Sequence, residues 1–379
     1  MDIKALDEQG NPVDWWFIYK VPKLSPGPGT DGATGYEYVY YDSEIDKKDI
    51  KSRVMGESAF VLNSNKGALN LTLDSVFKNY PAPPDPTTGW LLYNDEMPVM
   101  TNLKDDGAKG HTKGVLAFDT ATKTAYWLLH SWPKFTAPGS PTDPTPMYGQ
   151  TYLCVSLDLD TAEEIAKQMM TYQEPQVYFP KTADLPASSF IYQLANEKTF
   201  APPAASEHID IATIGGMPFT VFAKNREWNN DFWNDLVGPG LGDDMDDETW
   251  IRGPIAPVAD SDGIHKTFDI KYINLGSLGL HLAWPESHDH AKWGITLHKP
   301  YVCVGDINRM ISQRKRGGGA IAFQNTTLWS ALSKSSLVLA PPGHTRTEAS
   351  QMILDTQVHH SENPLKTINP APSPGKPRT

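Results

Sequence analysis

The sequence contains only two cysteines, Cys154 and Cys303, among its 379 residues. Two cysteines exclude a disulfide framework and a cysteine-rich metal site. Each lies in an apolar run typical of a strand, so both are expected in the core, with a single bridge between them as the alternative. There is also no run of about 20 apolar residues, the length that a membrane helix needs, so no membrane partner is expected. The opening residues Met1-Asp2-Ile3-Lys4 do not form a secretory signal peptide.

Positive charge is scarce: 33 Lys and Arg stand against 45 Asp and Glu, which gives a formal charge of −12 at pH 7. At neutral pH this balance argues against a polyanionic partner such as DNA. The chain also has 11 histidines, with an ordinary pKa of about 6.5. Their full protonation would bring the charge to about −1, so the exclusion of nucleic acid holds only near neutral pH.

Apart from these absences, the composition is that of a folded protein, with 10% aromatic residues. Aromatic runs at 14–19 and 36–41 predict strands, and the spacing of apolar residues over 69–78 favours a short helix. The clearest helix is predicted after Asp160, where residues 160–163 (Asp-Thr-Ala-Glu) read as a capping box.

Three polar or proline-rich stretches interrupt these elements. Residues 133–149 hold five prolines and predict a surface loop, and Ala201-Pro202-Pro203 is the best boundary between two halves. The acidic run 243–248 lacks the ligand spacing and central glycine of an EF-hand loop, so a solvated face is expected there instead of a calcium site. We therefore predict halves at 1–200 and 201–345, followed by a disordered tail at 346–379.

Two His-x-Lys tripeptides stand out, His111-Thr112-Lys113 and His290-Ala291-Lys292. Each opens a strand-like run, followed by a polar turn and a second strand. The two tripeptides are separated by about half the chain, so the pattern predicts a duplicated unit.

Strand geometry gives this pattern a chemical meaning. Residues i and i+2 of a strand point to the same face, so each histidine should project together with its lysine. Two such strands would surround one volume with two imidazoles and two ammonium groups. One histidine can attack phosphorus, the other can protonate the leaving oxygen, and the lysines can stabilise charge on the phosphate. Asn308 can add a neutral donor.

Two other interpretations stay open at this point. Each tripeptide taken alone is more typical of exposed polar residues at a strand end. Closely spaced ligands at 288–290 (His-Asp-His), joined by Asp119 and His130, would instead suggest a metal site, but no further clustered ligands accompany them. We therefore expect no metal and no cofactor.

At these residues the sequence resembles the deoxyribonuclease II family, within the phospholipase D superfamily. The resemblance is carried by Gly110-His111-Thr112-Lys113-Gly114 and Asp289-His290-Ala291-Lys292-Trp293. Further matching stretches follow in family order at 12–15, 91–95, 127–131, 148–151, 305–309 and 316–319.

The resemblance implies an α/β fold, a phospholipase D-like α/β/α sandwich with two pseudo-symmetric halves that each donate one His-x-Lys motif. It implies metal-independent hydrolysis of double-stranded DNA at acid pH, which leaves 3′-phosphate ends through a phosphohistidine intermediate. By analogy, His111 is the nucleophile and His290 the general acid, while Lys113, Lys292 and Asn308 bind phosphate. His130 supports the first half, and Asp119 and Asp306 are expected to be orienting carboxylates near the substrate.

The chain also departs from the family pattern. Animal members carry several disulfides, whereas this chain has two cysteines and none upstream of Pro12. The departure suggests a bacterial member, and a secreted, periplasmic or other acidic compartment is the expected location. A homodimer could widen the groove for duplex DNA. The alternative functions are a phospholipase D-like lipid phosphodiesterase and a non-catalytic DNA-binding protein.

Overall fold

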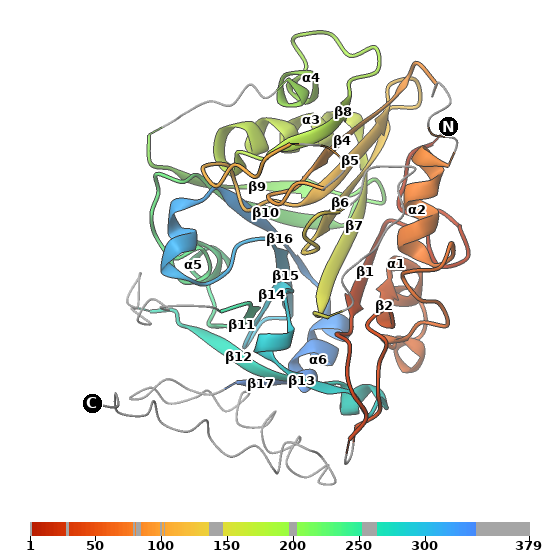
Figure 1. Cartoon of the computed structure of the whole chain (residues 1–379), viewed down its shortest axis with the longest axis vertical. Coiled ribbons are helices and arrows are strands. Elements are labelled where there is room, and N and C mark those ends of the chain that lie inside the picture. The colour runs from red at the N-terminus through yellow and green to blue at the C-terminus, as the bar shows by residue number, and fades with distance from the viewer. Residues whose placement is uncertain are drawn as a thin grey trace.

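A computed structural model describes residues 2–27, 30–78, 80, 85–98, 101, 103–135, 147–196, 203–251 and 264–338. Two large β-sheets dominate these residues, with helices beside them (Figure 1). The architecture is therefore a mixed α/β fold built on two sheets, in agreement with the predicted α/β class.

The first sheet is antiparallel throughout and has the strand order β3-β2-β1-β7-β6-β5-β4-β8. Its strands are β1 (Trp15–Lys20), β2 (Tyr38–Asp42), β3 (Gly56–Glu57), β4 (Thr88–Tyr93), β5 (Gly114–Asp119), β6 (Thr124–His130), β7 (Gln150–Asp158) and β8 (Val177–Lys181). The predicted aromatic strands at 14–19 and 36–41 correspond to β1 and β2. Aromatic and β-branched side chains favour these positions because a pleated sheet buries them well.

The second sheet has the order β13-β12-β11-β14-β15-β16-β10-β9, and β17 pairs with β12. Its strands are β9 (Ser206–Ala212), β10 (Pro218–Lys224), β11 (Met245–Thr249), β12 (Thr267–Asn274), β13 (Ala283–Pro285), β14 (Lys292–Thr296), β15 (Tyr301–Gly305), β16 (Gly318–Gln324) and β17 (Ser336–Val338). Only β11 and β12 pair in parallel.

The helices are α1 (Ser43–Asp46), α2 (Ala68–Phe77), α3 (Leu159–Gln168), α4 (Phe190–Ala195), α5 (Gly238–Leu241) and α6 (Thr326–Ser335). Helix α2 confirms the helix predicted over 69–78. Helix α3 begins earlier than predicted, because its N-cap is Asp158, whose side chain accepts from the Thr161 N–H at 2.7 Å. The predicted capping box at 160–163 is therefore wrong. Glu163 instead accepts from the Phe190 N–H at 2.6 Å, at the start of α4.

One hydrophobic core lies between the two sheets. Trp15 and Phe17 of β1 belong to it together with Val302 and Phe323 of the second sheet, and the rings of Trp15 and Phe323 are 5.2 Å apart. Trp16 and Ile18 point to the opposite face of β1, where Leu69 of α2 covers them. Such alternation follows from the two-residue period of a strand.

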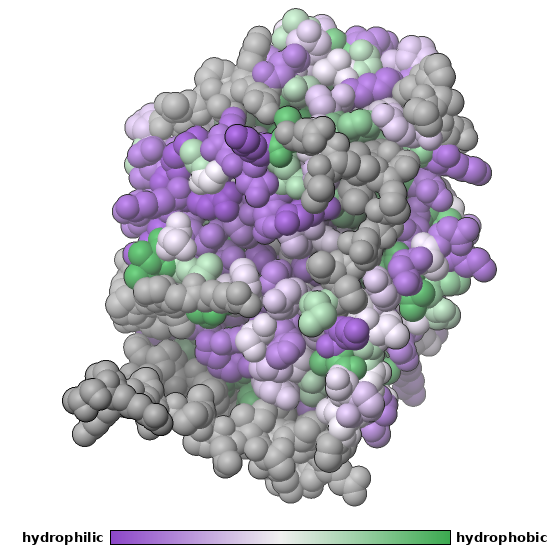
Figure 2. Space-filling model, viewed as in Figure 1, coloured by the Kyte–Doolittle hydropathy of each residue, from purple (hydrophilic) through white to green (hydrophobic). Residues whose placement is uncertain are grey.

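Both cysteines are buried and free, as expected for core residues, and they do not form the alternative bridge. Of the helices in the part of the chain that the structure describes, none has the length and apolar character that a membrane crossing requires. Hydrophilic residues dominate the face drawn in Figure 2, where hydrophobic ones occur in small groups among the described residues.

The acidic run at 243–248 contradicts the expectation of a solvated face. Residues 245–249 form β11, an interior strand between β12 and β14, and the side chains of Asp246, Asp247 and Glu248 are fully buried. The expectation failed because charge density suggests exposure, whereas position in the sheet decides burial.

Several predictions lie wholly or partly outside the described residues. They are most of the proline-rich loop at 133–149, two of the three residues at 201–203, and the tail at 346–379. The boundaries between the two halves stay a prediction.

Candidate active site

The first His-x-Lys tripeptide lies directly before β5, not within it, and is held by the loop before β16 of the second sheet and by the connection that precedes β8. The His111 N–H donates to the Gly317 carbonyl at 2.8 Å, while the preceding Gly110 N–H donates to the Glu174 carbonyl at 2.8 Å. A Cβ atom at Gly110 would lie 1.9 Å from the Gln173 carbonyl oxygen, so only glycine allows this approach. The backbone thus anchors His111 against residues distant in sequence.

Two acceptors flank the His111 imidazole. Its Nδ1 contacts the backbone carbonyl of Asp306, and its Nε2 lies 3.3 Å from Oδ2 of Asp95. Because a carbonyl can only accept a hydrogen bond, Nδ1 carries a proton and Nε2 is the ring atom available for proton exchange or attack.

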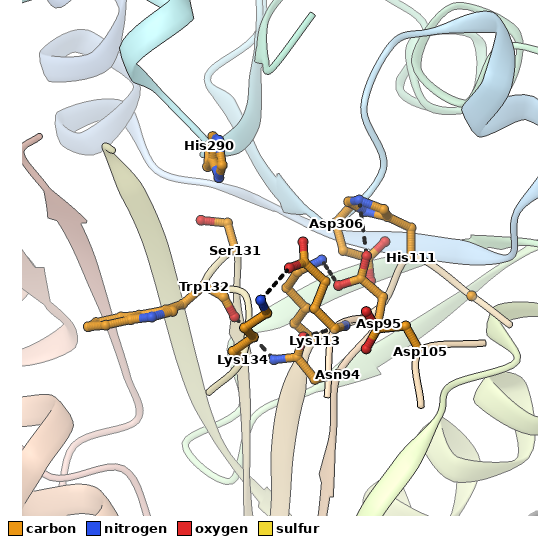
Figure 3. A network of polar contacts seen from close by, with 12 residues as sticks. Asn94, Asp95, Asp105, His111, Lys113, Ser131, Trp132, Lys134, His290 and Asp306 are labelled. Carbon is orange, nitrogen blue, oxygen red and sulfur yellow. Dashed lines mark hydrogen bonds and ion pairs between the residues drawn. The ribbon is translucent and has the colours of Figure 1, made fainter. Parts of the chain in front are cut away.

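Asp95 joins three basic groups and is the centre of this cluster. Figure 3 shows two of them, His111 and Lys113, beside its carboxylate. One carboxylate oxygen contacts Nζ of Lys113, and the other lies 3.3 Å from Nη1 of Arg316. Burial alone would raise the pKa of Asp95, but Lys113, His111 and Arg316 together hold it below its ordinary value. Asp95 is therefore an anion inside a cationic pocket.

The second His-x-Lys tripeptide lies at the start of β14 and is held by the first sheet's connections. The His290 N–H donates to the Gly149 carbonyl at 2.9 Å, and the Lys292 ammonium donates to the His290 carbonyl. The anchoring is therefore reciprocal. The loop before β16 of the second sheet holds His111, and the loop before β7 of the first sheet holds His290.

Asp289 fixes the strand that carries His290. Its buried carboxylate accepts from the Tyr19 hydroxyl of β1, from Trp284 Nε1 at 2.7 Å and from the Ala291 N–H at 2.8 Å. The Asp289 carboxylate therefore has a structural role, although the sequence allowed it as a metal ligand.

Two buried lysines occupy corresponding places in the two sheets. Lys20, the last residue of β1, donates to the Tyr148 carbonyl at 2.6 Å. Lys224, the last residue of β10, donates to the carbonyls of Gln313, Arg314 and Arg316. Each lysine therefore holds the loop that supports the other sheet's His-x-Lys tripeptide. Charged side chains are rarely buried without such partners.

The ionisable groups in this region influence one another. Burial and then Lys113 lower the pKa of Lys292 to about 7, and burial raises the pKa of Asp306 to about 7. Burial, followed by Lys113, also lowers the pKa of His111 well below its ordinary value. These effects couple His111, Lys113, Lys292 and Asp306 in one electrostatic environment.

Of the four accessory residues predicted, three lie close to the tripeptides in the chain or in the fold. The His130 backbone N–H donates to the Lys113 carbonyl at 3.3 Å, and its buried ring packs 4.5 Å from Phe135. Burial lowers the pKa of His130 to about 3. Asn308 is buried two residues beyond Asp306, and its Oδ1 atom has no hydrogen-bond partner within the described residues.

The structure does not bring Asp119 to this cluster. Asp119 ends β5, whereas Lys113 precedes the strand, so about 20 Å of strand separates them. Its carboxylate accepts from the backbone N–H groups of Ala121 and Thr122 at 3.0 and 2.8 Å and so stabilises the turn into β6. An aspartate before a turn commonly has this structural role.

Sequence reasoning missed four residues of the cluster: Asp95, Tyr148, Trp250 and Arg316. Tyr148 and Trp250 lie against the His290 ring, with ring centroids 3.9 and 4.1 Å away. Asp95, Tyr148 and Arg316 lie in stretches that match the family, but sequence reasoning assigned them no role. Asp95 also comes two residues after the buried strand β4, where polar site residues often lie. Trp250 had no such signal, since it follows the acidic run that was expected to be solvated.

No group of three or more His, Cys, Asp or Glu side chains able to hold a metal ion occurs among the residues described above. The cluster offers instead two imidazoles, three cationic side chains and the carboxyl groups of Asp95 and Asp306. Such a set suits the binding of an anion and the transfer of a proton.

Comparisons with known proteins agree with this chemistry. A family model described as Deoxyribonuclease II matches residues 4–341. A Burkholderia pseudomallei protein named for deoxyribonuclease-2 is 56% identical over 353 residues, covering 93% of this chain and 98% of that protein. Deoxyribonuclease-2-alpha of Rattus norvegicus is 30% identical, covering 87% and 91%, and that of Sus scrofa is 31% identical, covering 86% of each.

Among solved structures, a yeast tyrosyl-DNA phosphodiesterase matches with a TM-score of 0.27 and 11% identity, over 57% of this chain and 67% of that one. This similarity is too low to inform on the fold. The family model and the relatives cover nearly the whole chain, and so the chain belongs to the deoxyribonuclease II family.

Proposed function

We propose that this deoxyribonuclease II-like hydrolase is an acid endonuclease that cleaves DNA phosphodiester bonds without a metal, through a phosphohistidine on His111. In this proposal the two halves of the chain each donate one His-x-Lys motif to a single site. The reciprocal anchoring of the tripeptides at Gly149 and Gly317 supports this arrangement.

The observation that carries the proposal is the contrast between the two imidazoles. Burial and the neighbouring Lys113 lower the pKa of His111 well below its ordinary value, which favours an unprotonated Nε2. His290 is half-buried between aromatic rings, which favour a cationic imidazole. Neighbouring groups whose environments separate their protonation states are suited to nucleophile and acid roles.

The first step forms a bond between His111 Nε2 and phosphorus while the bond from phosphorus to the 5′ oxygen breaks. The electron pair of the broken bond stays on the 5′ oxygen, which takes a proton from His290. Lys113, Lys292 and Asn308 would stabilise the non-bridging oxygens, since phosphoryl transfer depends mainly on positioning and charge.

The second step uses water. His290, now neutral, accepts a proton from the water that attacks phosphorus, and the phosphorus–nitrogen bond breaks with its electron pair returning to Nε2. The product is a 3′-phosphate end, and both histidines regain their starting protonation states. An acidic compartment would match this chemistry.

Nicking of supercoiled plasmid at about pH 5 in EDTA tests the proposal. We expect cleavage that leaves 3′-phosphate ends, and a loss of at least about 10³-fold in His111→Ala and His290→Ala. The exposed His281→Ala serves as the control and should keep full activity. Loss of cleavage in EDTA would contradict the metal-free mechanism, and release of lipid head groups without DNA cleavage would support a lipid phosphodiesterase.

Rapid quenching with ³²P-labelled DNA, followed by peptide mapping, tests the roles of the two histidines. Label on His111 is expected. Label on His290 would reverse the assignment, and the absence of any covalent label with active enzyme would exclude the phosphohistidine.

A further inference from the structure

The His290 imidazole lies between two aromatic side chains, which we call the aromatic clamp: Tyr148 and Trp250. The Tyr148 ring stacks on His290 with centroids 3.9 Å apart and planes inclined by 12°. The Trp250 ring is 4.1 Å away and inclined by 49°. All three residues are half-buried, so the clamp covers the imidazole faces and leaves part of the site accessible.

Both sheets build the clamp. Tyr148 precedes β7, and its carbonyl accepts from the buried Lys20 at 2.6 Å. Trp250 follows β11, whose antiparallel register with β14 pairs Thr249 with Lys292 and so brings residue 250 beside the start of that strand. Backbone contacts of each sheet therefore fix the positions of Tyr148 and Trp250, in addition to the packing of their rings.

Aromatic faces carry negative electrostatic potential, so they stabilise an imidazolium more than a neutral imidazole. Stacking also restricts rotation of the ring. In Figure 3 the His290 side chain points toward Ser131 and the cluster around Asp95 and Lys113. The ring edge, which carries the proton, is thus directed at the site, while its faces are occupied.

Among the described residues, the other ionisable groups on the elements that meet at the clamp have contacts of their own. The Lys292 and Lys20 ammonium groups, which would disfavour a further cation, bond the carbonyls of His290 and Tyr148. The Asp289 carboxylate is committed to Tyr19, Trp284 and the Ala291 N–H. Burial raises the pKa of Glu248 on β11 well above its ordinary value, which favours its neutral form. Across the site lie Lys113, Asp95, Asp306 and His111.

We propose that Tyr148 and Trp250 are positioning residues that hold His290 as an oriented imidazolium, ready to give its proton to the leaving oxygen. This inference rests on the proposed function for the proton-transfer step. It adds two residues that do not react themselves but act through His290.

The direct test is the titration of the His290 ring by NMR in the full-length chain with ¹³C-labelled histidine, assigned by comparison with His290→Gln. Tyr148→Leu and Trp250→Leu should each lower the midpoint by about one pH unit, because each removes one cation–π contact. Tyr148→Phe and Trp250→Phe keep an aromatic face and should stay close to the parent. Trp329→Leu on α6, whose indole bonds the Thr296 carbonyl at the other end of β14, is the matched control and should not move the midpoint.

Plasmid cleavage across pH gives the second readout. In the Leu variants we expect kcat to fall about tenfold near pH 6, and its alkaline limb to move to lower pH by the same amount as the midpoint, with a smaller change in KM. Thermal unfolding identifies any variant that fails to fold, and the Phe variants then carry the comparison with the parent.

The outcomes separate the two proposals. An unchanged midpoint in both folded Leu variants, in an enzyme that cleaves DNA, overturns the clamp while leaving the proposed function intact. If the midpoint falls in the Leu variants but the parent chain does not cleave DNA, the proposed function is overturned. The proton-donor role of the clamped ring is then overturned with it.

Discussion

At the scale of single residues, Asp95 shows how one buried carboxylate can organise several cations. Lys113, His111 and Arg316 all contact it, although they come from both halves of the chain. Without a central anion, these groups would repel one another in a space with little water. Asp95 therefore holds Lys113, Arg316 and the His111 ring in one arrangement.

Replacing Asp95 by Asn tests this role. We expect kcat to fall about 10²-fold, because misplacement of catalytic groups by about 1 Å has effects of that size. Since Asp95 raises the pKa of His111, its neutralisation should also move the acid limb of kcat/KM to lower pH. Cleavage assays across pH measure both quantities.

The matched control is Asp105→Asn, an exposed neighbour whose carboxylate accepts from the Met97 N–H at 2.6 Å. This variant should keep the parent's rate and pH profile. An Asp95→Asn enzyme with the parent's acid limb would show that Asp95 does not act on His111.

At the scale of elements, β11 is the strand on which sequence and structure disagree most. Its acidic side chains are buried at an interior position of the second sheet. The strand also places Trp250, which follows it, beside His290. Burial raises the pKa of both Asp247 and Glu248 well above ordinary values. The folded state therefore keeps protons that the unfolded chain releases above about pH 4.3.

Because of this difference, Asp247 and Glu248 of β11 should make the free energy of unfolding larger at acid pH than at neutral pH. The contribution of Glu248 is fully present below its unfolded pKa and falls as pH rises, by up to about 1.4 kcal/mol per pH unit. Glu248→Gln removes that dependence, so we expect the variant to stabilise the protein more at pH 7.5 than at pH 4.5. Urea unfolding at both pH values measures the change.

The exposed Glu164→Gln on α3 is the control and should have little effect at either pH. Equal stabilisation by Glu248→Gln at the two pH values would show that Glu248 is ionised in the folded protein.

At the scale of the whole molecule, net charge depends strongly on pH. The formal charge of −12 at pH 7 opposes DNA binding, and histidine protonation reduces it. The structure limits this effect, because buried His111 and His130 have lowered pKa values and resist protonation. Four other histidines, His208, His281, His288 and His298, are exposed on the surface.

We therefore expect DNA affinity to fall at least about tenfold as pH rises from about 5 to 7.5 at fixed salt, because positive charge is lost from the surface. Fluorescence anisotropy with a labelled duplex and the His111→Ala variant measures binding without cleavage. Equal affinity at both pH values would contradict this electrostatic account.

Much of the fold was predictable from local patterns. Aromatic strands β1 and β2 and helix α2 have the periodicity that local sequence encodes, and both cysteines lie in apolar runs that are buried. The start of α3 was less predictable, because Asp158 and Asp160 are both acceptable caps by sequence. Glu163 was predicted to cap the start of α3, but it accepts from the Phe190 N–H at the start of α4. A contact between two helices cannot be read from local sequence.

The sequence alone determined the strands, the two His-x-Lys tripeptides and the histidine content, because these depend on residue type and short spacing. Only the tertiary structure decided that Asp95 meets Arg316, that Asp119 serves a distant turn, and that the acidic strand lies inside a sheet. These outcomes depend on which strands become neighbours, and burial there can oppose the preference of a charged side chain for water. Chain segments far apart in sequence thus complete the cluster around the two His-x-Lys tripeptides.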